Sequence, residues 1–167
     1  MEDADEISAL VTDLKSKSKQ NVPFYHKISG GGILAPEEWE LILSGDTSCL
    51  MNFFAGELIR KEGNHYSFIC QIASGSCRVE KTIEGQANVI LGTLKTGEIL
   101  GELQFFTGKA ATANVVAETD VEIYVLNCDF IRSLFDSHPH VVVNFYRFLC
   151  NMISQRIVKR EQEGWRR

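Results

Sequence analysis

Residues 97–117 read GEILGELQFFTGKAATANVVA and place a glycine–acid pair ahead of a short apolar segment, a loop and a strand. Gly101 and Glu102 precede the apolar segment, which predicts a short helix beginning near Gly101. Residues 107–109 predict a loop, and the alternation over residues 113–117 predicts a strand. The first N–H groups of a helix have no partners within it and can bind an anion. The stretch therefore predicts a cradle for a phosphate and a sugar hydroxyl.

Around this stretch, short apolar runs separated by turn residues extend over residues 49–126. The turn residues recur about every 8–12 positions, as in all-β barrels. Ser74-Gly75-Ser76 lies between two of the runs and is predicted to be a hairpin turn. The pattern predicts an antiparallel, jelly-roll-like β-barrel, with strands over residues 49–54, 58–61, 67–72, 77–83, 88–94, 113–117 and 121–126.

Helical patterns flank the predicted barrel on both sides. Residues 2–18 carry apolar residues at helical spacing, residues 19–35 predict a linker, and Pro36 followed by two glutamates predicts the start of a second helix. Beyond the last strand the apolar period returns to about 3.6, which predicts two helices, the longer beginning at Pro139. Its apolar stripe predicts core packing and consists of Val142, Phe145, Tyr146, Leu149, Met152, Ile153 and Ile157. The fold class is mainly β with flanking α-helices.

Composition limits the classes of function. The 17 basic and 22 acidic residues give a net charge of -5, which argues against a nucleic-acid partner. No apolar run approaches the length of about 18 residues that suggests a membrane span. The first residues are acidic where a signal peptide would be basic. The 5 cysteines have no C-x-x-C spacing, which predicts buried free thiols in a reducing compartment. We expect a cytoplasmic protein without membrane insertion.

The spacing of Gly101-Glu102 from Thr112-Ala113 resembles the phosphate-binding cassette of the cyclic nucleotide-binding domain family. In that family Gly-Glu is followed by a short segment, an arginine, and then Thr or Ala. The resemblance covers about residues 36–160. It implies that Glu102 accepts a hydrogen bond from the ribose 2′-hydroxyl of cAMP or cGMP and that the backbone amides of Leu103 and Gln104 hold the phosphate.

One position of the cassette departs from the family pattern. Laid on without a gap, the motif puts Ala111 where the family has its phosphate-binding arginine. A methyl group cannot replace a fork of N–H donors. Lys109 is the remaining cation of the loop and would reach a phosphate only if the loop folded back. The sequence therefore predicts weak or absent nucleotide affinity.

Each candidate site residue has a simpler alternative role. Glu102 could only satisfy N–H groups at a helix start, where acids are favoured. Lys109 could be a solvated loop charge, and Thr112 an ordinary strand residue. In the family a residue of the C-terminal helix can close over the base, so the resemblance makes Trp165 a candidate lid. The alternative is that Trp165 is an exposed residue or contacts a neighbouring domain.

Residues 38–43, 70–81 and 144–149 resemble versions of the domain embedded in multidomain signalling proteins, such as Ras-type exchange factors and kinases. With the helical pattern before it, this resemblance divides the chain into a helix and linker over residues 1–35, the nucleotide-binding-like domain over residues 36–160, and a tail over residues 161–167. The partners would be a cyclic nucleotide and the neighbouring domains of the larger protein.

Three hypotheses for the function remain, each in a different class. The first is a regulatory cyclic nucleotide sensor, and the second is a ligand-independent interaction module, which Ala111 favours. The third is a barrel enzyme with a metal, but the predicted barrel holds only one histidine, His65. His138-Pro139-His140 lacks a further ligand nearby in sequence. No Walker loop or nucleophile elbow occurs, so we expect no enzyme activity, no metal and no cofactor.

Overall fold

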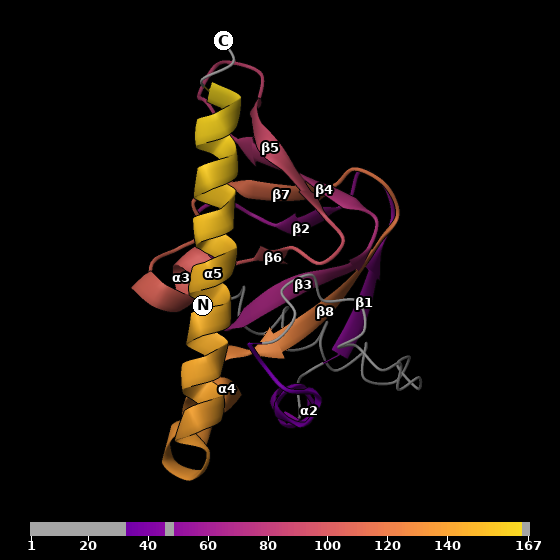
Figure 1. The fold of residues 1–167 in the computed structure, drawn as a ribbon. Helices are drawn as coiled ribbons and strands as arrows, with labels where there is room; N and C mark the ends of the chain where they lie inside the picture. Colours follow the sequence, from indigo (N-terminus) through magenta and orange to yellow (C-terminus); the bar gives the residue numbers. More distant parts are fainter. Residues whose placement is uncertain (1–32, 46–48, 165–167) are drawn as a thin grey trace.

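The computed structural model describes residues 33–45 and 49–164 (Figure 1). The predicted helix over residues 2–18, most of the predicted linker, and Trp165 lie outside the described residues. The described elements are α2 (Pro36–Leu43), β1 (Cys49–Phe53), β2 (Leu58–Arg60), β3 (Phe68–Ser74), β4 (Ser76–Lys81), β5 (Val89–Lys95), β6 (Ile99–Leu100), α3 (Glu102–Thr107), β7 (Asn114–Ala117), β8 (Val121–Asn127), α4 (Cys128–Ser137) and α5 (Pro139–Gly164).

The strands form two four-stranded antiparallel sheets, which confirms the predicted jelly-roll-like fold. One sheet has the order β1-β8-β3-β6, and the other has the order β2-β7-β4-β5. Side chains alternate along each strand, so Val121, Ile123 and Val125 of β8 are buried on one face. They join a core between the sheets whose other members include Met51, Ile59, Ile72, Leu94, Leu100 and Val115.

The connection at Gly75 differs from the prediction. The strands before and after it lie in different sheets, so Ser74-Gly75-Ser76 is a corner between sheets and not a hairpin turn. Gly75 has φ 85°, and a Cβ atom there would lie 2.3 Å from the carbonyl oxygen of Asp120. A short glycine turn is compatible with either a hairpin or a corner between sheets. The alternation of apolar and polar residues along a strand does not show which other strand it pairs with.

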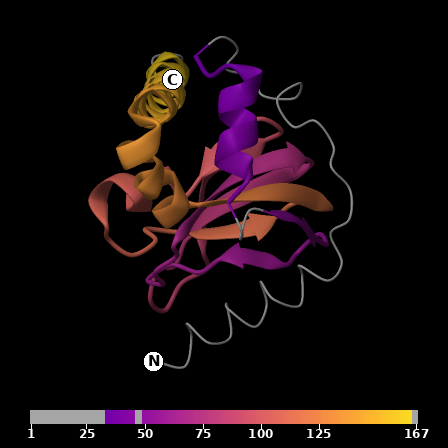
Figure 2. The same ribbon diagram turned by 90° about the horizontal axis from the view of Figure 1, so that it is seen from below.

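The helices pack together against one side of the sheets (Figures 1 and 2). Trp39 of α2 packs edge-on against Phe145 and Phe148 of α5, with ring centroids 6.2 Å and 5.1 Å apart. The side chain of Asn127 accepts a hydrogen bond of 2.8 Å from the N–H of Phe130 and so caps α4. As predicted, α5 begins at Pro139; it continues to Gly164, past the expected domain boundary at residue 160.

The cysteines follow the prediction only in part. Cys70, Cys77 and Cys128 are free and buried, whereas Cys150 is free but exposed on α5. Burial raises the pKa of the Cys70 and Cys77 thiols to about 12 and that of the Cys128 thiol to about 11. The apolar neighbours of Cys150 in the sequence suggested burial, but its own position falls on the solvent side of the helix.

Candidate functional site

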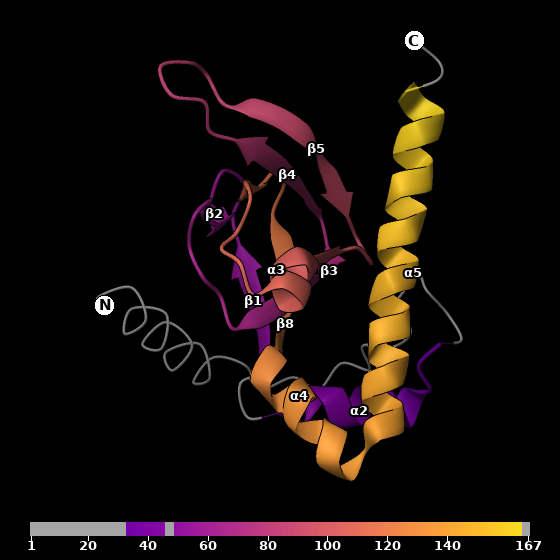
Figure 3. The same ribbon diagram turned by 90° about the vertical axis from the view of Figure 1, so that its left-hand side faces the viewer.

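A cavity of about 360 Å³ lies between α3, the sheet that contains β4 and β5, and the C-terminal half of α5. Its volume is typical of small-molecule sites, which span about 300–1,000 Å³. Figure 3 shows α3 end-on beside α5. Of the residues predicted for the site, the cavity brings together Gly101, Glu102, Leu103, Gln104, Ala111, Thr112 and Ala113.

Gly101 begins the cassette because no other residue fits its backbone and surroundings. It has φ 91°, the left-handed region that favours glycine, and it immediately precedes α3. A Cβ atom at this position would lie 2.2 Å from Nη1 of Arg60. The first turn of α3 is therefore pressed directly against the guanidinium group of Arg60.

Glu102 is buried and is joined to α5 by an ion pair. Nη1 of Arg156 donates a hydrogen bond of 2.6 Å to Oε1 of Glu102, and Nη2 donates one of 2.7 Å to the carbonyl oxygen of Ile99. Oε1 of Glu98 lies 3.9 Å from Nε of the same arginine. Two acidic groups thus balance the charge of Arg156. This pair links the cassette to the C-terminal helix, across 54 positions of sequence.

Arg60 is a second arginine at the cavity, and its side chain is buried with the residue only 2% exposed. Nη1 donates to the carbonyl oxygen of Phe68 at 2.9 Å, and Nη2 donates to Oε1 of Gln104 at 2.7 Å. The guanidinium carbon lies 4.2 Å from the ring centroid of Tyr66. Within the described part of the chain, none of the ion pairs includes Arg60.

Lys109 is not brought to the cavity. Helix α3 ends at Thr107, with Gly108 as its C-cap. The following Lys109 is exposed, and its backbone N–H donates a hydrogen bond of 3.2 Å to Oγ1 of Thr107. Ala111 lines the cavity instead, and two backbone hydrogen bonds hold it in place. Its N–H donates a hydrogen bond of 2.9 Å to the carbonyl oxygen of Asn64, and its carbonyl oxygen accepts one of 2.8 Å from the N–H of Gly63. The carbonyl of Thr112 accepts a hydrogen bond of 2.8 Å from Nζ of Lys81.

The apolar stripe of α5 is divided between the core and the cavity. Val142, Phe145, Leu149 and Met152 are buried in the core, as predicted. Ile153 and the exposed Ile157, which were assigned to core packing, line the cavity, so this part of the prediction is wrong. From Ile153 onward, the helix lies beside the cavity and β5 instead of the core.

The sequence analysis missed Arg60 and Arg156 as site residues. Arg60 lies in a strand, where an arginine would ordinarily face solvent, and Arg156 lies in the C-terminal helix, far from the cassette in sequence. In β2, Arg60 follows two apolar residues. This pattern only weakly indicates a buried arginine, because the sequence does not show which face of the strand is buried. The partners of both arginines are distant in sequence, so only the fold brings them to the cassette.

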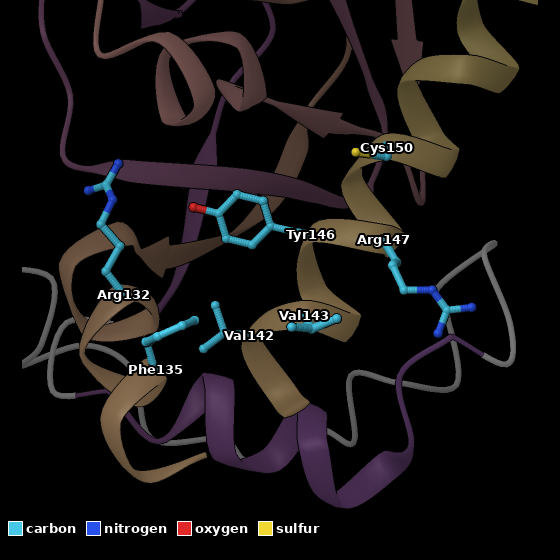
Figure 4. A pocket seen from close by; sticks show the side chains of 7 residues that line it. All are labelled: Arg132, Phe135, Val142, Val143, Tyr146, Arg147 and Cys150. Carbon is cyan, nitrogen blue, oxygen red and sulfur yellow. The ribbon is translucent and has the colours of Figure 1, made fainter. Parts of the chain in front are cut away.

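A second hollow of about 510 Å³ lies between α4 and α5, where Phe135, Val142, Val143 and Tyr146 provide apolar surface (Figure 4). Arg132, Arg147 and Cys150 complete its lining. The guanidinium of Arg132 donates a hydrogen bond of 2.9 Å to Oδ1 of Asp129 and one of 3.2 Å to the carbonyl oxygen of Phe105. The side chains that line this hollow include no carboxylate, so it offers no acceptor for a sugar hydroxyl comparable to Glu102.

The described residues contain neither a metal-ligand cluster nor a membrane-spanning helix. Among them, no group of three or more His, Cys, Asp or Glu side chains is placed to hold a metal ion. No helix in residues 33–45 or 49–164 is both long and apolar enough to cross a membrane.

Solved structures share this fold. A cyclic nucleotide-binding domain from Methylobacillus flagellatus superposes with a TM-score of 0.70 at 19% identity and covers 93% of this chain and 81% of its own. The catabolite activator protein of Thermus thermophilus has a TM-score of 0.61 at 26% identity, over 86% of this chain and 63% of its own.

Sequence comparison identifies relatives and the family. Cyclic GMP-binding protein C of Dictyostelium discoideum is 31% identical over 157 residues, which cover 90% of this chain but 6% of that protein. The cAMP-dependent protein kinase regulatory subunit of the same organism is 27% identical over 74% of this chain and 35% of its own length. This chain thus spans a small part of these relatives. The family model described as "Cyclic nucleotide-binding domain" matches residues 50–138, and the chain belongs to that family.

Proposed function

We propose that this chain is a cyclic nucleotide-sensing regulatory domain of a larger signalling protein. The observation that carries the proposal is the cavity itself, which places the buried Glu102 beside the start of α3 and residues 111–113. These are the groups that the cassette resemblance assigns to the ribose and the phosphate. Membership of the family and the small share of the relatives that the chain covers support a regulatory module within a longer protein.

In this proposal the nucleotide enters between the cassette and α5. Glu102 accepts a hydrogen bond from the ribose 2′-hydroxyl, and the phosphate lies against the start of α3. The base lies against the apolar part of the cavity lining, which includes Val79, Leu91 and Ile157. A cavity that is mostly apolar with a few converging polar groups is typical of small-molecule sites.

The ion pair between Glu102 and Arg156 supplies a route from the ligand to α5. A ribose hydroxyl that donates to Glu102 would either compete with the 2.6 Å hydrogen bond from Arg156 or bind beside it. In both cases the strength of the contact between α5 and the cassette changes. A ligand shifts such an equilibrium only by its difference in affinity for the two arrangements. Neighbouring domains would then respond to the position of α5.

We further propose that nucleotide affinity is weaker than an arginine at position 111 would give, because Ala111 provides no guanidinium and Lys109 lies outside the cavity lining. The second candidate function is a ligand-independent interaction module. Ala111 favours it, and so does the engagement of Glu102 by Arg156, which already satisfies one carboxylate oxygen without a ligand.

Calorimetric titration of the purified chain with cAMP and with cGMP tests the sensor directly. We expect binding of at least one nucleotide, and its loss in Glu102→Gln, which keeps the size of the side chain but removes the carboxylate. Glu84→Gln, at an exposed turn, is the matched control and should bind like the original chain. Absence of binding for both nucleotides by the original chain would contradict the sensor and favour the interaction module.

A further inference from the structure

We propose that Arg60 of β2 is the cation that binds the nucleotide phosphate in this domain, in place of the guanidinium that Ala111 lacks. This inference rests on the proposed function, since it names the phosphate contact of the same cavity. The three observations that carry it are the burial of Arg60 without a counter-charge, its position under the start of α3, and an exchangeable hydrogen-bond partner.

The charge of Arg60 is buried but not balanced. Arginine keeps its proton in proteins, and a buried charge is costly unless it is paired. The hydrogen-bond acceptors of Arg60 are the carbonyl of Phe68 and the amide of Gln104, both neutral. Burial raises the pKa of the nearby Cys70 thiol to about 12, so that group is also neutral. The described residues therefore leave an unpaired positive charge at the cavity.

The position of this charge matches that of the expected phosphate. Nη1 of Arg60 lies 2.2 Å from where a Cβ atom of Gly101 would be, directly under the residue that begins α3. Arg60 lines the cavity together with Gln104 and Ala111. A planar guanidinium can bind two phosphate oxygens at once, which a lysine cannot do.

The contacts of Arg60 allow a phosphate to bind without turning the side chain. The carbonyl of Phe68 holds Nη1, and the ring of Tyr66 lies against the guanidinium, so its plane is fixed. Nη2 is held by Gln104, whose flexible side chain can give way to a phosphate oxygen. By contrast, the charge of Arg156 is balanced by Glu102 and Glu98.

Calorimetric titration with cAMP and cGMP tests the assignment in four chains: the original, Arg60→Gln, Arg147→Gln and Arg60→Gln/Ala111→Arg. A hydrogen bond to a charged group corresponds to about a ten- to hundredfold change in affinity, and we expect that loss in Arg60→Gln. Arg147 is exposed and lies outside the cavity, so Arg147→Gln makes the same chemical change and should bind like the original. The double variant should regain affinity, because an arginine at 111 would serve the same phosphate.

A folded Arg60→Gln with unchanged affinity would overturn the assignment while leaving the proposed function intact. No binding by the original chain would instead contradict the proposed function, and the assignment with it. Melting curves establish which variants are folded. If Arg60→Gln does not fold, Gln104→Met decides, because it removes the competing acceptor and keeps Arg60. We expect it to raise affinity by about two- to tenfold; an unchanged or lower affinity would overturn the assignment.

Discussion

The cavity beside α3 and the hollow between α4 and α5 differ in what they bury and not only in size. The hollow between α4 and α5 is the larger, about 510 Å³, and the arginines that line it are exposed. The cavity beside α3 is about 360 Å³ but contains the buried Glu102 and Arg60. Buried charged groups are costly unless they are paired, and the acceptors that Arg60 contacts among the described residues are neutral. Volume alone would have selected neither of them, because a third hollow between β5 and α5 is larger than both, at about 680 Å³.

The largest effect should follow from removing the buried carboxylate. Glu102→Ala would leave Arg156 without the closest of its acidic partners, and breaking a buried ion pair costs about 3–5 kcal/mol. Because Arg156 is partly exposed and keeps Glu98, we expect the lower end, about 3 kcal/mol less free energy of unfolding in urea. Glu84→Ala is the control and should change it by under about 0.5 kcal/mol. Equal losses in both variants would mean that the ion pair contributes nothing to stability.

Restoring an arginine at position 111 should strengthen nucleotide binding. Ala111 lines the cavity, so Ala111→Arg places a second guanidinium beside the expected phosphate. We expect a gain of about 1.5–3 kcal/mol in binding free energy, the usual contribution of a hydrogen bond to a charged group. Paired titrations of the two chains measure it. Tight binding by the original chain, or no gain in a well-folded variant, would show that position 111 does not face the phosphate.

Binding should also distinguish the cavity from its exposed rim. Glu102→Gln removes a partly dry carboxylate and should cost about 1.5–3 kcal/mol of binding free energy. Lys109→Ala removes an exposed charge outside the cavity lining and should cost under about 1 kcal/mol. Titration of both variants gives the comparison. If Lys109→Ala lost as much as Glu102→Gln, the loop would have to fold back over the ligand, contrary to the structure.

The smallest effect should come from the second hollow. Cys150 lines it and is exposed, whereas Cys70, Cys77 and Cys128 are buried with raised thiol pKa values, so Cys150 should react first with a thiol reagent at neutral pH. Cys49 is the fifth cysteine, and Cys49→Ser removes it so that the other four are compared. In this variant we expect mass spectrometry to find one modified site, Cys150, and we expect the nucleotide affinity to be unchanged. A lower nucleotide affinity after modification would mean that the hollow between α4 and α5 influences binding at the cavity beside α3.

The sequence was sufficient where the determining contacts are local. Gly101 and Glu102, the short helix α3 and the start of α5 at Pro139 follow from residues adjacent in the chain, and the structure confirms their placement. The two arginines could not be predicted, because the partner of Arg60 on α3 is 44 positions away and that of Arg156 is 54 positions away. The prediction of a hairpin at Gly75 was wrong for a related reason, because strand pairing depends on residues outside the turn. Strand β6 has only two residues and gives no alternation.

The comparison of the two hollows is tested most directly by ¹⁵N–¹H spectra of the chain with saturating cAMP or cGMP, which detect even weak binding. We expect the largest shifts at the backbone amides of residues 101–104 and 110–113 and at the side-chain Nε–H of Arg60. Amides around the second hollow, from Arg132 to Cys150, should shift less, and only through α5. Largest shifts at the second hollow, or no shifts anywhere at saturating nucleotide, would contradict the claim that buried charge marks the ligand site.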